Sequence, residues 1–354
     1  MPYLFEIVTI AISFLIASLS IPLTIKLCHK YQILDFPGEH KRHKQPIPLL
    51  GGLVLFASVW ITILIALIFF PNSFTGLSGM LLYIFLGSTI ILLVGISDDL
   101  KPLSAWVKLI AQIASAILLF FGGIDVEYLT TPFGSIDLGQ YSILITILWV
   151  VMLTNAINLI DGLDGLAVGV SLIGAVTMLI IGLLYQSGGV MVFLLALIGF
   201  SLIFLYYNRY PAKIFLGDSG SMQIGYYFAV FSLIFPLKSY TVSALYLPLL
   251  ALGVPLLEVA SSFTRRLMTG KNIMKADRRH LFHYLALFGL SPSQVVLVFY
   301  LLAIVYGACA IAMYYWNRVL VFSILVFFMV VIFGIFYIFI TKLSSRKSSL
   351  GQKK

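Results

Sequence analysis

The segment I-L-I-T-I-L-W-V-V-M-L-T-N-A-I-N-L-I-D-G-L-D-G-L, residues 143–166, decides how the chain is built. An apolar run fills its first half, and polar side chains follow at three-residue intervals, at Asn155, Asn158, Asp161 and Asp164. On a helix this spacing forms one slowly winding polar stripe. Acids beside hydrocarbon are costly and usually mark a functional site that faces the interior of a helix bundle. We therefore expect a membrane helix whose polar end binds a cation, a phosphate-bearing ligand, or both.

Similar apolar runs recur along the chain. Hydrophobic residues make up 61% of its 354 residues and charged residues only 10%. Runs of about 20 apolar residues are long enough to cross a bilayer, so the sequence predicts an all-α, multi-pass membrane protein with about 11 transmembrane helices. The expected spans are 4–27, 49–70, 78–97, 104–122, 141–159, 166–185, 190–207, 221–237, 241–263, 294–315 and 318–342. One membrane domain (1–343) and a disordered basic tail (344–354) would account for the whole chain.

The charged residues indicate the orientation of these helices. With the N-terminus outside, all 22 Lys and Arg residues except Lys238 and Arg318 fall on one side, which the positive-inside rule assigns to the cytoplasm, together with the C-terminus. The net charge of +9 is thus a topology signal and does not indicate nucleic-acid binding. Most acids fall on the same side, although acids contribute little to orientation. We therefore expect the acids to share the cytoplasmic face for a functional purpose other than orientation.

The end of the third expected span carries adjacent acids in G-I-S-D-D-L-K, residues 95–101. Neighbouring helix positions point about 100° apart, so Asp98 and Asp99 should have different partners, one acting as a base while the other orients a group. Two solvated acids that cap a loop are the alternative. Lys108, expected about two turns into the next span, could reach a phosphate or simply extend its ammonium to the interface.

A second acidic motif, F-L-G-D-S-G-S, spans residues 215–221. Gly217 permits close backbone approach, and a helix beginning after Asp218 would offer free N–H groups to an anion. An Asp/Ser helix cap explains the motif equally well. Together with the other carboxylates, Asp218 is a suitable metal ligand.

Two inner loops carry clustered cations. The first contains Lys41 and His43 and leads to Gly51-Gly52, which should open the next helix in close packing; a topogenic basic cluster explains the lysines, but not the histidine. The second contains the run R-R-H-L-F-H, in which Arg279, His280 and His283 suit a pyrophosphate. A two-His zinc site lacks a third soft ligand nearby, whereas binding to anionic lipid is a real alternative. The two cysteines, Cys28 and Cys309, are expected at different membrane levels and hence unpaired.

Between Asp35 and Leu285 the chain resembles the polyprenyl-phosphate N-acetylhexosamine-1-phosphate transferases of the WecA and TagO type, which are related to MraY. The resemblance rests on the motifs D-x-P-x-x-x-K-x-H-x-x-P-I-P-x-x-G-G, S-D-D, N-x-x-N-x-x-D-G-x-D-G-L-A, F-L-G-D-x-G-S and D-R-x-H-L-x-H. One position departs from the family pattern. The last motif usually reads H-x-H-H, whereas here Phe282 replaces the middle histidine.

This resemblance implies transfer of a sugar 1-phosphate from a UDP-N-acetylhexosamine to undecaprenyl phosphate, with release of UMP and with magnesium, or manganese in its place. It implies that Asp218 and Asn158 hold the metal and that Asp98 prepares the lipid phosphate, with Asp99 and Asn155 beside it. The residues implied at the nucleotide sugar are Asp161, Asp164, Phe215, Gly217, Lys108, Arg279, His280 and His283, and Lys41 and His43 are further candidates.

Three other functions would also account for part of the sequence. The related MraY activity on UDP-MurNAc-pentapeptide would need a larger surface that accommodates the peptide. A cation-coupled transporter would place its carboxylates near the membrane midplane, whereas these acids lie at span ends. A non-catalytic scaffold does not explain why the acids share one side. The sequence leaves open the N-acetylhexosamine, the envelope polymer, the effect of Phe282 and whether a homodimer forms.

Overall fold

The computed structural model describes residues 4–37, 45–74, 76–131, 134–184, 191–234, 252–268, 285, 289–317, 320–321 and 323. Its helices are α1 (Leu4–Tyr31), α2 (Gly51–Phe69), α3 (Ser78–Leu100), α4 (Ala105–Phe121), α5 (Ser142–Ile160), α6 (Leu166–Leu184), α7 (Met191–Asn208), α8 (Gly217–Ile234), α10 (Gly253–Met268) and α12 (Pro292–Tyr315). Its strands are β1 (Leu34–Asp35), β2 (Ile47–Pro48), β3 (Tyr128–Thr131) and β4 (Gly134–Asp137), and short 3-10 helices cover Pro71–Phe74 and Gly139–Tyr141.

The prediction of a helical, multi-pass membrane protein is confirmed. Within the described ranges, seven helices are long and apolar enough to cross a membrane, namely α1, α2, α3, α5, α6, α7 and α12, and α4 is a shorter apolar helix. Helices α8 and α10 overlap the eighth and ninth expected spans. The last expected span, 318–342, lies almost wholly outside the described residues. The total of 11 helices and the orientation in the membrane stay predictions.

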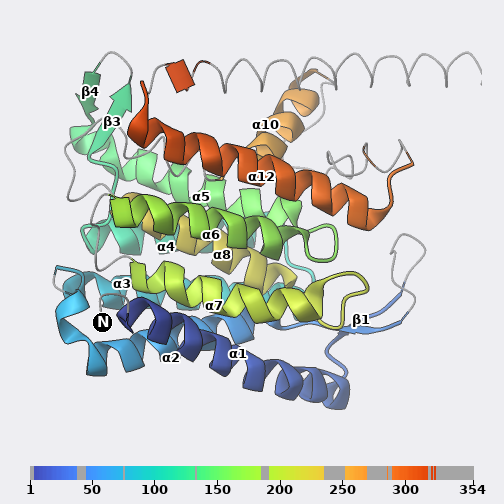
Figure 1. Cartoon of the computed structure of the whole chain (residues 1–354). Coiled ribbons are helices and arrows are strands. Elements are labelled where there is room, and N and C mark those ends of the chain that lie inside the picture. Colours follow the sequence, from blue (N-terminus) through green and yellow to red (C-terminus); the bar gives the residue numbers. More distant parts are fainter. Residues whose placement is uncertain are drawn as a thin grey trace, which may run out of the picture.

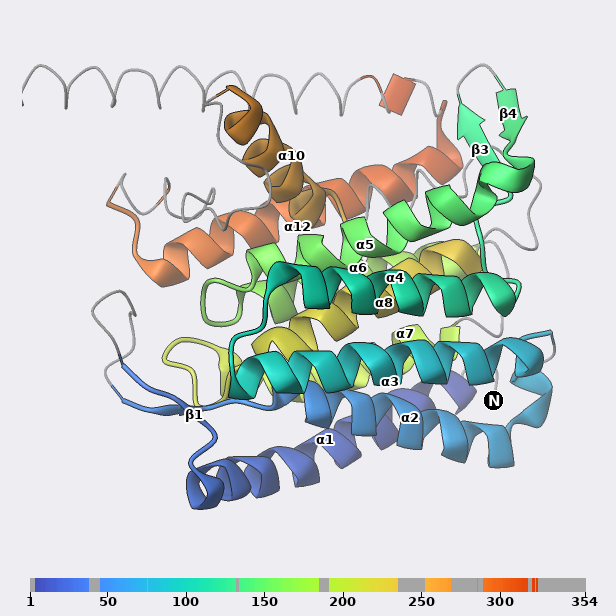
Figure 2. The ribbon, with the colours of Figure 1, turned by 180° about the vertical axis from the view of Figure 1, so that it is seen from behind.

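Helix α8 runs through the middle of the bundle, where it packs against α2, α3, α5 and α7 (Figures 1 and 2). Every residue from Ser219 to Ile234 is buried, so α8 has no lipid-facing side. A helix enclosed by protein can carry polar side chains if each finds a partner. Gln223 donates to the backbone carbonyl of Ser88, and Ser232 accepts from the indole of Trp149.

Two glycines allow neighbouring backbones to approach the first turn of α8. A Cβ on Gly52, in α2, would lie 2.4 Å from the backbone nitrogen of Gly220. One on Gly95, in α3, would lie 2.3 Å from the Cα of Ser219. The close packing expected at Gly51-Gly52 is therefore confirmed, and α2 and α3 hold the start of α8 between them.

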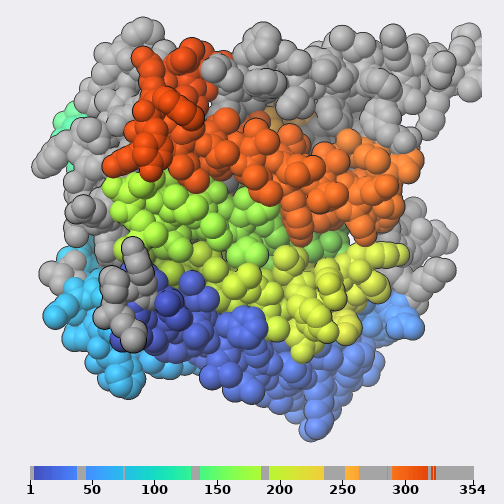
Figure 3. Space-filling model, in the orientation of Figure 1, coloured from blue at the N-terminus to red at the C-terminus, as the bar shows by residue number. Residues whose placement is uncertain are grey.

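The outer helices form a continuous face in which α1, α7, α6 and α12 follow one another (Figure 3). Apolar side chains point outward from it, such as Leu19 of α1 and Leu301 of α12, as lipid-facing positions should. Cys28 and Cys309 are both free thiols, as the sequence predicts.

The two ends of the bundle differ. The β1–β2 ribbon and the turns that follow α3, α5 and α7 gather at one end, whereas the N-terminus and the β3–β4 hairpin lie at the other (Figures 1 and 2). Both ribbons are antiparallel and two-stranded. An all-α description misses them, because strands of two to four residues in loops leave no periodic pattern to detect. The acidic motifs all belong to the first of these ends.

Candidate functional site

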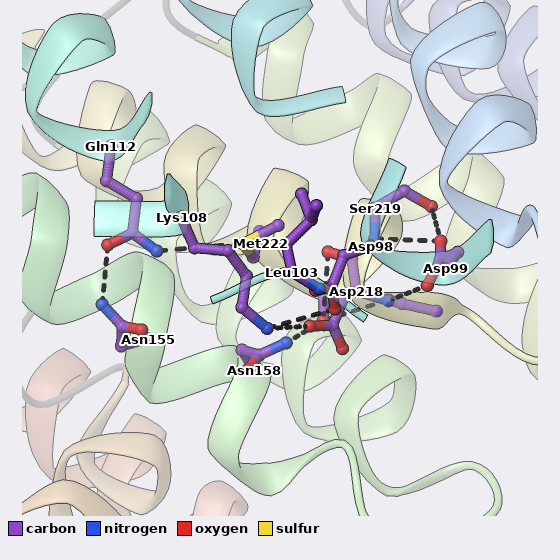
Figure 4. Close-up of polar contacts among 12 residues, drawn as sticks. Asp98, Asp99, Leu103, Lys108, Gln112, Asn155, Asn158, Asp218, Ser219 and Met222 are labelled. Atoms are coloured by element: carbon purple, nitrogen blue, oxygen red, sulfur yellow. Dashed lines mark hydrogen bonds and ion pairs between the residues drawn. The ribbon is translucent and has the colours of Figure 1, made fainter. Parts of the chain in front are cut away.

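The acidic motifs meet around the first turn of α8 (Figure 4). Asp98 and Asp99 lie in the last turn of α3, because this helix continues to Leu100, beyond the expected end of its span. Asp218 is the second residue of α8, which begins four residues before the expected position 221. Helices α4 and α5 pack against each other and close the site from the remaining sides.

Lys108 bridges two of the carboxylates. Its Nζ donates to Oδ2 of Asp218 at 2.7 Å and to Oδ2 of Asp98 at 3.1 Å. The side chains of Lys108 and Asp218 keep 25% and 31% of their surface exposed, so solutes can reach the charged group. Lys108 lies in the first turn of α4, closer to the helix start than expected, since α4 begins at Ala105. The other oxygen of Asp98 accepts from the backbone of Leu103 at 2.7 Å.

Asp99 has a different set of partners, as the prediction for adjacent helical acids requires. Its carboxylate accepts from the backbone nitrogens of Asp218 at 2.7 Å and Ser219 at 3.2 Å, and from the Ser219 hydroxyl at 2.5 Å. The N-terminal N–H groups of a helix favour an anion, and Asp99 supplies one from the neighbouring helix. The expectation that these N–H groups are free for a ligand is therefore wrong for Asp218 and Ser219.

Gly217 makes this contact possible. Its φ is +73°, a left-handed backbone conformation that side chains rarely adopt, and a Cβ there would lie 2.6 Å from Oδ2 of Asp99. Glycine is required here by backbone conformation and by space. The predicted role of Gly217 in nucleotide binding is untested by this geometry and stays a prediction.

The two asparagines of the predicted stripe lie in α5, whereas the two acids lie in the turn after it. Asn158 donates from Nδ2 to the hydroxyl of Ser221 at 2.9 Å, which joins α5 to α8. Asn155 donates from Nδ2 to Oε1 of Gln112 in α4 at 2.8 Å. Sequence reasoning missed Gln112. A signal was present, because Gln112 stands four residues after Lys108 in an otherwise apolar helix and so shares its face.

The turn of residues 161–165 brings two more acids to this end. Asp164 accepts from the backbone nitrogen of Ala212, in the loop before α8. Asp161 is half-buried, and among the described residues no hydrogen bond to its carboxylate is found. Burial, together with the negative charges of Asp218, Asp99 and Asp164, raises the pKa of Asp161 to about 8. A cationic ligand beside Asp161 would therefore stabilise the ionised form of this carboxylate.

The turn is also fixed by residues from other helices. The Tyr300 hydroxyl of α12 donates to the carbonyl of Gly165 at 2.6 Å. The side-chain oxygen of Asn208 accepts from the Gly165 nitrogen at 3.1 Å, and its amide nitrogen donates to the carbonyl of Ile214. Two helices distant in sequence, α7 and α12, thus hold the acidic turn beside the loop that precedes α8.

Of the remaining predicted site residues, Phe215 lies in the described part of the chain and the others do not. Phe215 pairs through its backbone with Pro48 and Gly51, so the F-L-G-D-S-G-S motif is joined to the first inner loop. The predicted residues Lys41, His43, Arg279, His280 and His283 lie outside the described residues, as does Phe282.

The donor set can be compared with the needs of a magnesium ion. No group of three or more His, Cys, Asp or Glu side chains that could hold a metal occurs in the described part of the chain. Magnesium needs fewer protein ligands, because it prefers oxygen donors and keeps several waters. Asp98 and Asp218 already share one positive charge, that of Lys108. Two carboxylates arranged in this way fit a hard divalent cation.

Known proteins are similar to this chain over most of its length. The family model described as glycosyl transferase family 4 matches residues 81–236, which include every motif residue from Asp98 to Asp218. A probable undecaprenyl-phosphate N-acetylglucosaminyl 1-phosphate transferase of Bacillus subtilis is 35% identical over 339 residues, 92% of each chain. The chain belongs to glycosyl transferase family 4.

Two further known proteins are similar to it as well. A decaprenyl-phosphate N-acetylglucosaminephosphotransferase of Mycobacterium leprae is 34% identical over 78% of this chain and 75% of its own. A phospho-N-acetylmuramoyl-pentapeptide-transferase of Staphylococcus saprophyticus is 30% identical over 87% of this chain and 97% of its own. The resemblance inferred from the motifs is thereby confirmed.

Proposed function

We propose that this protein transfers N-acetylglucosamine 1-phosphate from UDP-N-acetylglucosamine to undecaprenyl phosphate. An oxygen of the lipid phosphate attacks the sugar-bearing phosphorus of the nucleotide sugar, the bond from that phosphorus to the UMP oxygen breaks, and UMP leaves. The observation that carries this proposal is the bridge from Lys108 to Asp98 and Asp218 at the end of the bundle. A lipid phosphate held in the bilayer and a nucleotide from solution can both reach charges at that level.

The charged residues of the site have different proposed roles. Asp98 positions the lipid phosphate or takes its proton, and Lys108 stabilises the charge that builds on the transferred phosphoryl group. Asp218 and the side-chain oxygen of Asn158 would hold a magnesium ion, which would help to neutralise the charge of the pyrophosphate. Asp99 acts indirectly, because it fixes the start of α8 and so the position of Asp218.

The remaining predicted residues belong to the nucleotide end. Asp161, Asp164 and Phe215 stand on the two loops that Asn208 and Tyr300 hold together, which supports a shared role in binding the nucleotide sugar. Arg279, His280 and His283 are proposed to face the pyrophosphate, with Lys41 and His43 as further candidates.

A product assay tests the reaction. Purified protein is incubated with magnesium, undecaprenyl phosphate or decaprenyl phosphate, and a panel of UDP-sugars, and the lipid product is identified by its mass. We expect a lipid-linked N-acetylglucosamine 1-phosphate product and an equal amount of UMP, both abolished by chelation of magnesium. Release of UMP without a lipid product would contradict the proposal.

The same panel includes UDP-MurNAc-pentapeptide. The staphylococcal relative, matched over nearly its full length, favours this donor as the second candidate. A product that carries the pentapeptide would replace the first proposal. A cation-coupled transporter is less well supported, since Asp98 and Asp99 lie in the last turn of α3 and Asp218 in the first turn of α8, away from the middle of these helices.

We propose that the protein lies in a bacterial plasma membrane with its site on the cytoplasmic face. There it would catalyse the first membrane step in the synthesis of an envelope polymer. Cysteines placed at the exposed positions Ser104 and Ser291, at the site end, should resist an impermeant thiol reagent in intact cells. A cysteine at exposed Gln140, at the other end, should react. Cys309 is first replaced by serine to lower the background. The reverse labelling pattern would contradict the cytoplasmic placement.

A further inference from the structure

Gln112 is a buried carboxamide in the middle of an apolar helix. Its side chain is 1% exposed, and it lies one helical turn beyond Lys108 on the same face of α4. A buried amide in a membrane bundle is costly unless its hydrogen bonds are made. Both the oxygen and the nitrogen of the Gln112 side-chain amide have partners. Its Oε1 accepts from Asn155 at 2.8 Å, and its Nε2 lies 3.8 Å from the sulfur of Met222 in α8.

These contacts fix which way the Asn155 amide faces. Its Nδ2 donates to Gln112 and also to the backbone carbonyl of Val151 at 2.8 Å, so both N–H bonds of the amide are used. In Figure 4 the nitrogen points at Gln112 and the oxygen turns away from it. What Asn155 can offer a ligand is therefore a carbonyl oxygen. If the amide turned over, two oxygens would face each other across the pair.

The same helix face thus serves two parts of the site. Lys108 holds the carboxylates of Asp98 and Asp218, and four residues later Gln112 holds Asn155. Because α4 packs on α3 and on α5, one helix sets the distance between the acids and the asparagine. The sulfur of Met222 is a weak acceptor, and it is satisfied only when the Gln112 amide nitrogen points toward α8.

We propose that Gln112 is a positioning residue that keeps the oxygen of Asn155 directed at the reactants. This inference rests on the proposed transferase function. Since Asn155 presents only an acceptor, its ligand is a hydrogen-bond donor of the nucleotide sugar or a cation, and it is not a phosphate oxygen. Without the Gln112 acceptor, the Val151 carbonyl alone holds the Asn155 amide in this orientation, and the amide can turn more readily to present N–H groups.

A double-mutant cycle in the full-length protein tests this. Gln112→Leu and Asn155→Ala are each expected to lower kcat/KM by roughly 10- to 100-fold, the range for one lost hydrogen bond to a charged or polarised group. The double variant should be no slower than Asn155→Ala, because Gln112 acts only through Asn155. Gln112→Glu keeps an acceptor oxygen and should restore most of the loss. Separate KM values for magnesium and for UDP-N-acetylglucosamine show which ligand the Asn155 oxygen meets.

Gln223 supplies the matched control. It is another fully buried glutamine, bonded to Ser88 and Tyr227 in the core. Gln223→Leu should lower the melting temperature, and its effect on kcat/KM should multiply with that of Asn155→Ala. Two results would show that Gln112 is merely structural and would overturn the inference. In the first, the effect of Gln112→Leu on kcat/KM also multiplies with that of Asn155→Ala. In the second, Gln112→Glu is as slow as Gln112→Leu.

Two further arms keep the test decisive. If Gln112→Leu does not fold, Gln112→Met, closer in length, takes its place in the cycle. If the wild type makes no lipid product from any UDP-sugar, the proposed function falls by itself. The cycle is then run on calorimetric binding of magnesium and of UDP-N-acetylglucosamine, where full coupling supports the inference and independent effects overturn it.

Discussion

Lys108 donates a hydrogen bond to Asp218 over 2.7 Å and so joins the first turn of α4 to the first turn of α8. The ammonium also contacts Asp98, and among the described residues it is the counter-ion that the two carboxylates share. Lys108 therefore occupies a position that a divalent cation would also favour. Binding of magnesium and binding of Lys108 to Asp218 should compete.

Lys108→Met tests this competition. We expect the magnesium affinity of the substrate-free protein to rise about tenfold, since a competing positive charge is removed. Turnover should fall by roughly 10²- to 10³-fold, because a cation that stabilises the transferred phosphoryl group is lost. Calorimetry measures the first effect and product formation the second, with Lys108→Arg as the charge-preserving control. Weaker magnesium binding in Lys108→Met would show that the lysine does not compete.

Asp98→Asn and Asp99→Asn form a matched pair of adjacent substitutions. Asp99 accepts three hydrogen bonds at the start of α8, so its replacement should lower the melting temperature as well as the activity. Asp98→Asn should reduce turnover at least 100-fold while the melting temperature changes little, because its contacts are with Lys108 and a loop nitrogen. Thermal unfolding in detergent and product formation measure the two quantities. A fully stable, inactive Asp99→Asn would instead indicate direct participation in the reaction.

Gly217→Ala should destabilise the protein strongly. The left-handed backbone alone costs about 1–2 kcal/mol for alanine, and contact with the Asp99 carboxylate adds to it. Gly123 is the control, since its φ of +71° is nearly the same and a Cβ there would meet no atom within 4 Å. Gly123→Ala should show the backbone cost alone in thermal unfolding. Equal losses of stability in the two variants would mean that the Asp99 contact contributes nothing.

The raised pKa of Asp161 predicts a pH-dependent stability. Its pKa of about 8 in the folded protein lies above the ordinary value of 3.8, so the folded state favours the protonated acid. Stability from this group is complete below pH 4 and is lost as the pH rises through 8. Asp161→Asn mimics the protonated form, so its melting temperature should exceed that of the wild type at pH 8.5. The difference should vanish at pH 4, which serves as the internal control, and a constant difference at both pH values would contradict the pKa shift.

Most of the bundle could be predicted from the sequence because apolar runs mark membrane spans directly. Expected and observed bounds for α2, α4, α5 and α6 agree within two residues. Helices α1 and α3 continue three to four residues beyond their expected ends, and α8 begins four residues earlier than its hydropathy suggests. Its first residues are polar, and they are helical because Asp99 of α3 caps them. A cap supplied from another helix leaves no signature in the local sequence.

The sequence predicts which residue types form the site better than it predicts which of these residues contact one another. Five carboxylates and two amides were expected together, and the structure brings them to one end of the bundle. Asp99 binds backbone N–H groups, whereas Asp98 binds Lys108. This difference depends on how α3 is rotated about its axis, and the composition of the chain does not determine that rotation. Gln112 shares a helix face with Lys108, but the sequence does not show what lies opposite it, and its partner Asn155 is seen only when α5 is placed beside α4.

The hydrogen bond from Tyr300 to Gly165 also affects the order in which the protein can be completed during synthesis. Helices α3, α4, α5 and α8 emerge from the ribosome before α12, so the charged cluster can assemble while the acidic turn still lacks its last support. Only when α12 docks on α6 does the turn acquire its tyrosine partner. The membrane insertion machinery would therefore release a nearly formed catalyst whose final adjustment is made by one of the last helices to arrive.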